Sequence, residues 1–124
     1  MGDQMRMRLA CTHLRRLRGL KPYEGDEGFR DVLVIAPCND IHTLGMHRPI
    51  DVAFVDEEGL VLKTYKCLAP GRRLRHPGAH AVLERFSPPD ERSLEGEVPL
   101  LACGSHADSW WHAGERVRLA GGAW

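Results

Sequence analysis

One stretch of the chain constrains the fold more than any other, because it combines a buried strand, a tight turn and a return strand. Residues 50–55 are apolar apart from Asp51. The next four residues begin with Asp56 and end with Gly59, a composition typical of a hairpin turn. Residues 60–66 then return as the partner strand. The sequence therefore predicts an antiparallel β-hairpin with one strand deep in a core.

Other segments carry strand patterns of their own. Residues 5–10 alternate apolar with charged side chains, as an outer strand with one buried face does. Residues 31–36 form an apolar run that stops at Pro37, which indicates a strand covered on both faces. We expect strands near residues 5–10, 31–36, 50–55, 60–66, 80–86 and 115–119.

Helices contribute little to the predicted fold. Thr12 is suited to cap a short helix that ends at Gly19, and Ser87 is suited to cap another across residues 89–94. Long connections without regular helices between strands argue against a doubly wound α/β fold. We therefore predict an α+β domain, mostly antiparallel β, with a compact barrel-like sheet and one or two short helices over an opening.

Size and charge limit the class of protein. The chain has 124 residues, which is the usual size of one domain, so residues 1–124 are expected to form a single domain with a mobile tail at 120–124. Lys plus Arg and Asp plus Glu each number 17, so no basic field would attract nucleic acid. No apolar run is long enough for a membrane span or a signal peptide. We expect a cytoplasmic monomer without a cofactor or a nucleic-acid partner, or an exported protein if a leader was removed.

The four cysteines are widely spaced and form no C-x-x-C pair. Four thiols allow three disulfide pairings, which the sequence alone does not rank. We expect reduced thiols, with Cys11 and Cys67 acting as small core residues among apolar neighbours. The set comprises Cys11, Cys38, Cys67 and Cys103.

The segment 38–62 also carries a family signature. Its marked positions are Cys38, Ile41-His42-Thr43, Gly45-Met46, Pro49-Ile50-Asp51-Val52, Phe54, Asp56, Gly59 and Val61. This pattern resembles the bacterial and archaeal family known as domain of unknown function 192. The resemblance extends from about Thr12 to Leu119, but residues 18–20 and 26–29 depart from the family's usual segments. The resemblance implies a fold and leaves the reaction open. The gene neighbourhoods of some family members imply a partner in envelope or pilus assembly.

The polar loop from Cys38 to Arg48 is the candidate site. Our leading hypothesis is a non-catalytic or accessory module that uses this loop, carried by a rigid hairpin, to recognise an unknown ligand or protein partner. No complete catalytic signature accompanies the loop. The candidate binding residues are Cys38, His42, Thr43, Met46 and Asp51.

Two chemical alternatives use the same loop. In a small hydrolase-like enzyme, His42 would activate Cys38 as a nucleophile or act with Asp51. Asn39, Asp40 or Asp51 could orient the imidazole, and the sequence does not choose among them. In a metal site, Cys38, His42 and His47 would be zinc ligands, completed by Cys67 or water.

Asp51 has a physical reason to recruit a partner, because an isolated buried charge is costly. Arg48 and the loop amides before Pro49 are the candidates, which would make Asp51 an anchor for the loop. Met46 is expected to fill a gap in the core, and Gly45 to allow a tight backbone turn. We also expect at least one ring of the pair at 110–111 to lie in the core.

Overall fold

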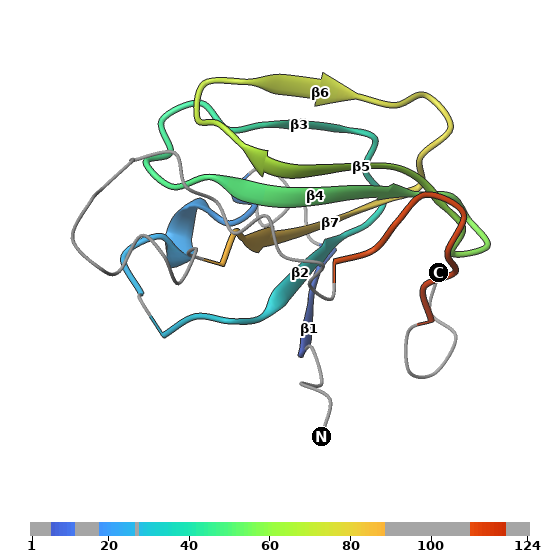
Figure 1. The fold of residues 1–124 in the computed structure, drawn as a ribbon, viewed down its shortest axis with the longest axis horizontal. Helices are drawn as coiled ribbons and strands as arrows, with labels where there is room; N and C mark the ends of the chain where they lie inside the picture. Colours follow the sequence, from blue (N-terminus) through green and yellow to red (C-terminus); the bar gives the residue numbers. More distant parts are fainter. Residues whose placement is uncertain (1–5, 12–17, 27, 89–109, 119–124) are drawn as a thin grey trace.

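The computed structural model describes residues 6–11, 18–26, 28–88 and 110–118, and shows a fold built almost entirely from strands (Figure 1). Five strands form one sheet in the order β1-β2-β7-β4-β5, and two more form the ribbon β3-β6. The strands are β1 (Met7–Ala10), β2 (Val32–Ile35), β3 (Asp40–His42), β4 (Ile50–Val55), β5 (Val61–Leu68), β6 (Arg73–Arg75) and β7 (Ala81–Phe86).

The predicted hairpin is confirmed. β4 and β5 pair antiparallel, and every residue of β4 is buried. In the turn, the Asp56 carboxylate accepts hydrogen bonds from the backbone N–H groups of Glu58 and Leu60, at 2.8 and 2.9 Å. Gly59 has a φ of 86°, a conformation that favours glycine. The turn composition therefore determines the local backbone as the sequence predicts.

The other strand predictions are confirmed in most places. β2 and β7 lie within the predicted segments, and β1 is an outer strand, although it pairs parallel with β2. The described part of the last predicted strand forms only one bridge, between Arg116 and Leu60, and Leu119 lies outside the described residues. β3 and β6 were not predicted.

The sheet is open, so the barrel-like closure that the sequence suggested is not observed in the described ranges. β1 and β5 are its two edges. The central strands β2, β7 and β4 are almost fully buried, because both faces of the sheet are covered. All pairings within the sheet are antiparallel except the one between β1 and β2.

Alternation along β4 and β7 creates two cores. One face carries Ile50, Val52 and Phe54 with Val82 and Phe86. The opposite face carries a second cluster, in which Ala53, Val55 and Leu83 pack with Trp110 and Val117. Asp51 must point to the second face and Glu84 to the first, because successive side chains on a strand alternate.

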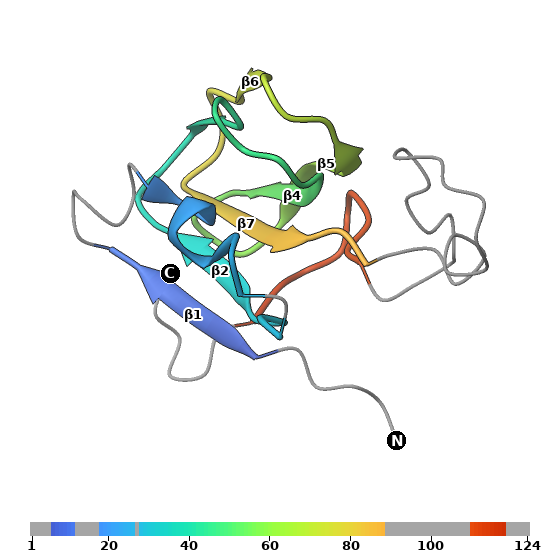
Figure 2. The ribbon, with the colours of Figure 1, turned by 90° about the vertical axis from the view of Figure 1, so that its left-hand side faces the viewer.

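The first face is covered by the β3-β6 ribbon and by the segment around a 3-10 helix, η1 (Lys21–Tyr23), as the two ribbon views show (Figure 2). Leu20, Ile41 and Met46 bring these segments into the core. Met46 is therefore a core residue, as predicted. The helix expected from Thr12 to Gly19 falls mostly outside the described residues, as does the one expected after Ser87.

The second face is covered by the segment 110–118. Trp110 is buried and its Nε1–H donates to the Val52 carbonyl oxygen at 3.3 Å. Trp111 packs edge-on against it, with ring centroids 5.1 Å apart. The expectation that one ring of this pair lies in the core is confirmed.

The cysteine prediction is wrong in two respects. Cys67 is disulfide-bonded, and Cys11 is exposed. Cys67 occupies an irregular position at the end of β5, with a φ of 58°, where the pairing register with β4 shifts. A strand pattern in the sequence does not reveal such an irregularity. The apolar neighbours of Cys67 were therefore not enough to predict its environment. Cys103 lies outside the described residues.

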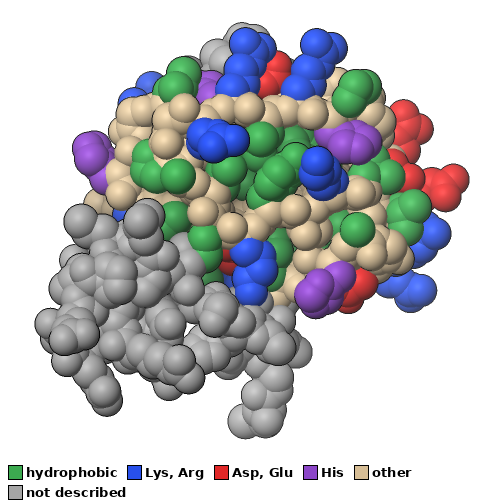
Figure 3. All heavy atoms as spheres, turned by 45° about the horizontal axis from the view of Figure 1, so that its top comes forward, with side chains coloured by type: hydrophobic (Ala, Val, Ile, Leu, Met, Phe, Trp, Pro, Cys, Tyr) green, Lys and Arg blue, Asp and Glu red, His purple; other side chains and the backbone are tan. Residues whose placement is uncertain are grey.

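Basic side chains line the outer face of the ribbon, which Figure 3 turns toward the viewer. Arg72, Arg73 and Arg75 are exposed there. The Asp40 carboxylate accepts hydrogen bonds from Arg73 at 2.7 and 3.1 Å, and this pair holds the pKa of Asp40 below its usual value. None of the described helices is both long and apolar enough to cross a membrane.

Candidate ligand pocket

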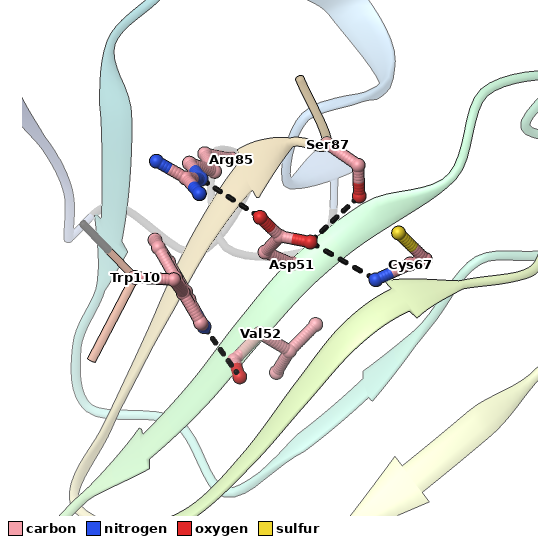
Figure 4. A network of polar contacts seen from close by, with 6 residues as sticks. All are labelled: Asp51, Val52, Cys67, Arg85, Ser87 and Trp110. Carbon is pink, nitrogen blue, oxygen red and sulfur yellow. Dashed lines mark hydrogen bonds and ion pairs between the residues drawn. The ribbon is translucent and has the colours of Figure 1, made fainter. Parts of the chain in front are cut away.

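Asp51 is bound from three directions on the second face of the sheet (Figure 4). Its Oδ2 accepts from Arg85 Nε at 2.8 Å. Its Oδ1 accepts from the Ser87 hydroxyl at 2.7 Å and from the Cys67 backbone N–H at 2.9 Å. The carboxylate is fully buried, so these donors replace the water that it loses on folding.

The partner of Asp51 is therefore Arg85 rather than Arg48. Asp51 and Arg85 lie directly opposite each other in the β4-β7 register. The Arg85 guanidinium also stacks over the Trp110 ring, 4.8 Å from its centroid. Asp51 thus joins β4, the end of β5, the end of β7 and the segment 110–118, and this role is structural.

Glu84 is the second buried acid, and its surroundings are different. It lies on the first face, with 3% of its surface exposed. Burial raises the pKa of Glu84 to about 7, while a hydrogen bond from the Leu20 backbone acts in the opposite direction. Among the described residues, no charged side chain contributes to this shift. The carboxyl therefore changes its protonation state near neutral pH.

A pocket of about 90 Å³ opens above Glu84. Three segments form it: residues 18–21, β3 with the loop that follows it, and the central strands below. Its apolar lining comes from Leu20, Ile35, Ile41, Leu44 and Met46, and its polar lining from Arg18, Lys21, Asp40, His42 and Glu84.

Two glycines bring the walls of this pocket close to charged groups. A Cβ atom on Gly19 would lie 3.1 Å from Glu84 Oε2. A Cβ atom on Gly45 would lie 2.9 Å from Lys21 Nζ. Both residues have positive φ, 52° and 78°, so the predicted tight turn at Gly45 is confirmed. Larger residues at either position would displace a charged group of the pocket.

The loop after β3 is held at both ends. The Thr43 hydroxyl donates to the Ala69 carbonyl oxygen at 2.8 Å and accepts from the Arg72 backbone N–H at 2.9 Å. At the other end, the Glu24 carboxylate accepts from the backbone N–H groups of His47 and Arg48. Burial alone would raise the pKa of Glu24, but these hydrogen bonds lower it overall.

The candidate residues from the sequence do not gather at one place. His42 and Met46 line the pocket above Glu84. The Cys38 thiol instead donates to the Asp40 carbonyl oxygen at 3.2 Å, and it lines a separate hollow with Asn39. Asp51 faces the opposite side of the sheet.

The three candidate metal ligands are also separated. His47 is exposed, and its Nδ1 lies 3.3 Å from Glu24 Oε1 rather than beside Cys38. Across the described ranges, no group of three or more His, Cys, Asp or Glu side chains is placed to hold a metal ion.

Glu84, Glu24 and Lys21 were not among the site residues that the sequence predicted. A signal for Glu84 was available, because Val82, Glu84 and Phe86 alternate along one strand and so share one face. A charged residue between two apolar residues on one strand face predicts a buried charge. No comparable signal marked Glu24, whose partners lie 23 and 24 residues further along the chain.

No family model matches the sequence. No curated protein matches it either. Two solved structures have similar folds. A protein of unknown function from Novosphingobium aromaticivorans has a TM-score of 0.56 and 22% identity over 66% of this chain and 63% of the other. A candidate transcription regulator from Sinorhizobium meliloti has a TM-score of 0.55 and 16% identity over 64% of this chain and 67% of the other. The chain thus spans less than two thirds of the first protein, and both similarities concern the fold.

Proposed function

We propose that this protein is a non-catalytic binding module, and that the pocket above Glu84 accepts a small molecule with an anionic head group and an apolar body. The observation that carries the proposal is a buried, ionisable carboxyl at the base of a pocket with two cations in its lining. The Cys38–Arg48 loop supplies one wall through His42, Leu44 and Met46. We also propose membership of the domain of unknown function 192 family, which the motif in residues 38–62 supports.

The charges of the pocket favour an anionic head group. Arg18 and Lys21 are exposed cations in the lining, whereas the Asp40 carboxylate is paired with Arg73. Below neutral pH, protonated Glu84 adds a neutral hydrogen-bond donor at the base. An anion would therefore meet positive charge and a donor.

The size of the pocket favours a small ligand. Its volume of about 90 Å³ is well below the roughly 300 to 1,000 Å³ of sites for drug-sized molecules. Leu20, Ile35 and Ile41 provide apolar contacts for a short hydrocarbon chain. A short-chain carboxylate combines both properties, and butyrate is a suitable probe.

The experiment is a titration with butyrate at pH 6 and pH 8, followed by backbone amide NMR shifts. We expect shifts at Leu20, Ile41 and Met46, and weaker binding at pH 8 because ionised Glu84 repels the carboxylate. Lys21→Gln should weaken binding, whereas Lys63→Gln, an exposed lysine on β5, should not. Absence of shifts at the pocket, or equal affinity in Lys21→Gln, would contradict the proposal.

A second candidate function is acid–base catalysis by Glu84. The specific observation is a carboxyl whose pKa of about 7 lies near a typical operating pH, in a pocket that also contains His42 and Lys21. This version of the enzyme hypothesis uses His42 without Cys38 or Asp51, which do not line the pocket. Turnover of a small ester or amide substrate that is abolished by Glu84→Gln would favour it over the binding module.

A further inference from the structure

A second pocket, of about 100 Å³, lies at the end of β7, beside the ends of the polar loop and of the segment before β2. Three arginines line it, together with two aromatic rings and a hydroxyl. These residues are Arg30, Arg48 and Arg85, with Phe29, Phe86 and Ser87. None of them lines the pocket above Glu84.

Arg48 is the most informative residue of this pocket. Its guanidinium stacks on the Phe86 ring, with the central carbon 4.0 Å from the ring centroid. Stacking leaves the edge of the guanidinium available for hydrogen bonds in its own plane. Nevertheless its Nη1 is buried and has no hydrogen-bond partner in the protein. A buried charged donor without an acceptor is unfavourable, so an acceptor from outside the protein would stabilise it.

The backbone holds Arg48 in this position before any ligand arrives. Its N–H donates to Glu24 Oε2 at 2.9 Å. Phe29 packs edge-on against Phe86, with ring centroids 6.2 Å apart, and fixes the ring on which the guanidinium stacks. The donor is therefore preorganised, which lowers the entropy cost of binding.

The lining of the pocket indicates the class of ligand. Its charged residues are Arg30, Arg48 and Arg85, and no acidic side chain lines the pocket in the described part of the chain. Three guanidinium groups around one pocket match the several oxygens of a phosphate better than the two oxygens of a carboxylate. Guanidinium groups bind phosphate oxygens with paired hydrogen bonds.

We infer that this pocket binds a phosphate dianion, either free or as a monoester, with the buried Nη1 of Arg48 as its central donor. The inference is independent of the pocket above Glu84. The phosphate proposed for the pocket beside Arg48 belongs to a different chemical class from the short-chain carboxylate proposed for the pocket above Glu84.

The experiment is calorimetric titration of the full chain with inorganic phosphate at pH 8, at an ionic strength held constant with chloride. Arg48→Gln should weaken phosphate binding roughly 10-fold or more, because it removes a charge-assisted hydrogen bond. Arg30→Gln, at an exposed side chain, should weaken binding without affecting folding. Methyl phosphate in place of phosphate tests the monoester, and acetate tests a monocarboxylate.

Two control variants test whether cations outside this pocket contribute to phosphate affinity. Arg72→Gln removes an exposed arginine beside the ribbon, and Lys21→Gln removes a cation of the other pocket. Neither should change phosphate affinity. The inference is overturned if wild type binds no phosphate, if acetate binds equally well, or if folded Arg48→Gln and Arg30→Gln bind phosphate like wild type.

Discussion

Asp51 and Arg85 are cross-strand partners in the β4-β7 register, and their side chains form an ion pair with 2.8 Å between Oδ2 and Nε. Only 1% of the Asp51 side chain and 11% of the Arg85 side chain are exposed. The pair lies on one face of the sheet, and Glu84, the residue before Arg85, lies on the other. One short segment of β7 therefore contributes a structural charge to one core and an ionisable group to the opposite pocket.

Asp51→Asn should destabilise the protein strongly, because it removes the negative charge that faces the largely buried Arg85 guanidinium. We expect a loss of about 3 kcal/mol or more in the free energy of unfolding, measured by urea denaturation. Asp40→Asn is the matched control, since it breaks an ion pair in which 74% of the Arg73 side chain is exposed. Equal losses in the two variants would show that burial does not increase the contribution of the Asp51–Arg85 pair to the free energy of unfolding.

Glu84 should make stability depend on pH. Its pKa is about 7 in the folded protein and near 4.5 when unfolded, so the folded state holds the proton more tightly. Stability is then greatest below pH 4.5, falls as pH rises from 4.5 to 7, and changes no further above that. The expected fall is about 3 kcal/mol from this residue.

Glu84→Gln should remove that part of the pH dependence and be more stable than wild type at pH 8. Urea denaturation at pH 5, 6, 7 and 8 measures the difference between the two proteins. A constant difference across this range would mean that Glu84 ionises alike in the folded and unfolded states.

Gly45→Ala should weaken ligand binding in the pocket as well as strain the backbone. Gly45 and Gly71 have φ values of 78° and 80°, so alanine at either position should cost roughly 1 kcal/mol of stability. A Cβ at Gly71 meets no atom within 4 Å, but one at Gly45 would lie 2.9 Å from Lys21 Nζ. Butyrate binding should therefore weaken in Gly45→Ala alone. Equal binding by both variants would argue against a role for Lys21.

Glu24→Ala should loosen the end of the polar loop. The Glu24 carboxylate binds the backbone N–H groups of His47 and Arg48, so their amide hydrogen exchange should accelerate in this variant. Glu57→Ala, at an exposed turn carboxylate, is the control. Unchanged exchange at both amides would show that Glu24 is not needed to hold the loop.

In wild type, the same contact should respond to acid. The pKa of Glu24 is lowered from the usual 4.5, so its contribution to stability is present above pH 4.5 and is lost as pH falls through the lowered value. The amide shifts of His47 and Arg48 should follow that titration.

The parts of the fold that the sequence predicted are those with local signals. The run of apolar residues in β4 and the turn residues Asp56 and Gly59 specify the hairpin by themselves. β3 and β6 have three residues each and carry charged side chains, so no periodicity distinguished them from loops. Closure of the sheet depends on how distant strands pair, which local patterns do not record.

The site was less predictable, because its contacts join distant residues. The apolar residues around Asp51 indicated that it needs a partner, but they did not indicate which residue the partner is. Arg85 lies 34 residues away in the sequence and is brought opposite Asp51 by the strand register. Cys38 and His42 were considered together because they are close in sequence. In the structure, Cys38 and His42 line different hollows. Lys21 and Glu84 line the same pocket as His42.

We propose that Glu84, a buried carboxyl with a pKa near neutral pH, lies at the base of a ligand pocket. The most direct test is a pH titration of the Glu84 side-chain carboxyl by carbon-13 NMR, with and without butyrate. We predict a pKa of about 7 in the free protein and a higher value with butyrate, because a bound anion favours the protonated form. A pKa near 4.5 that butyrate does not change would contradict the account.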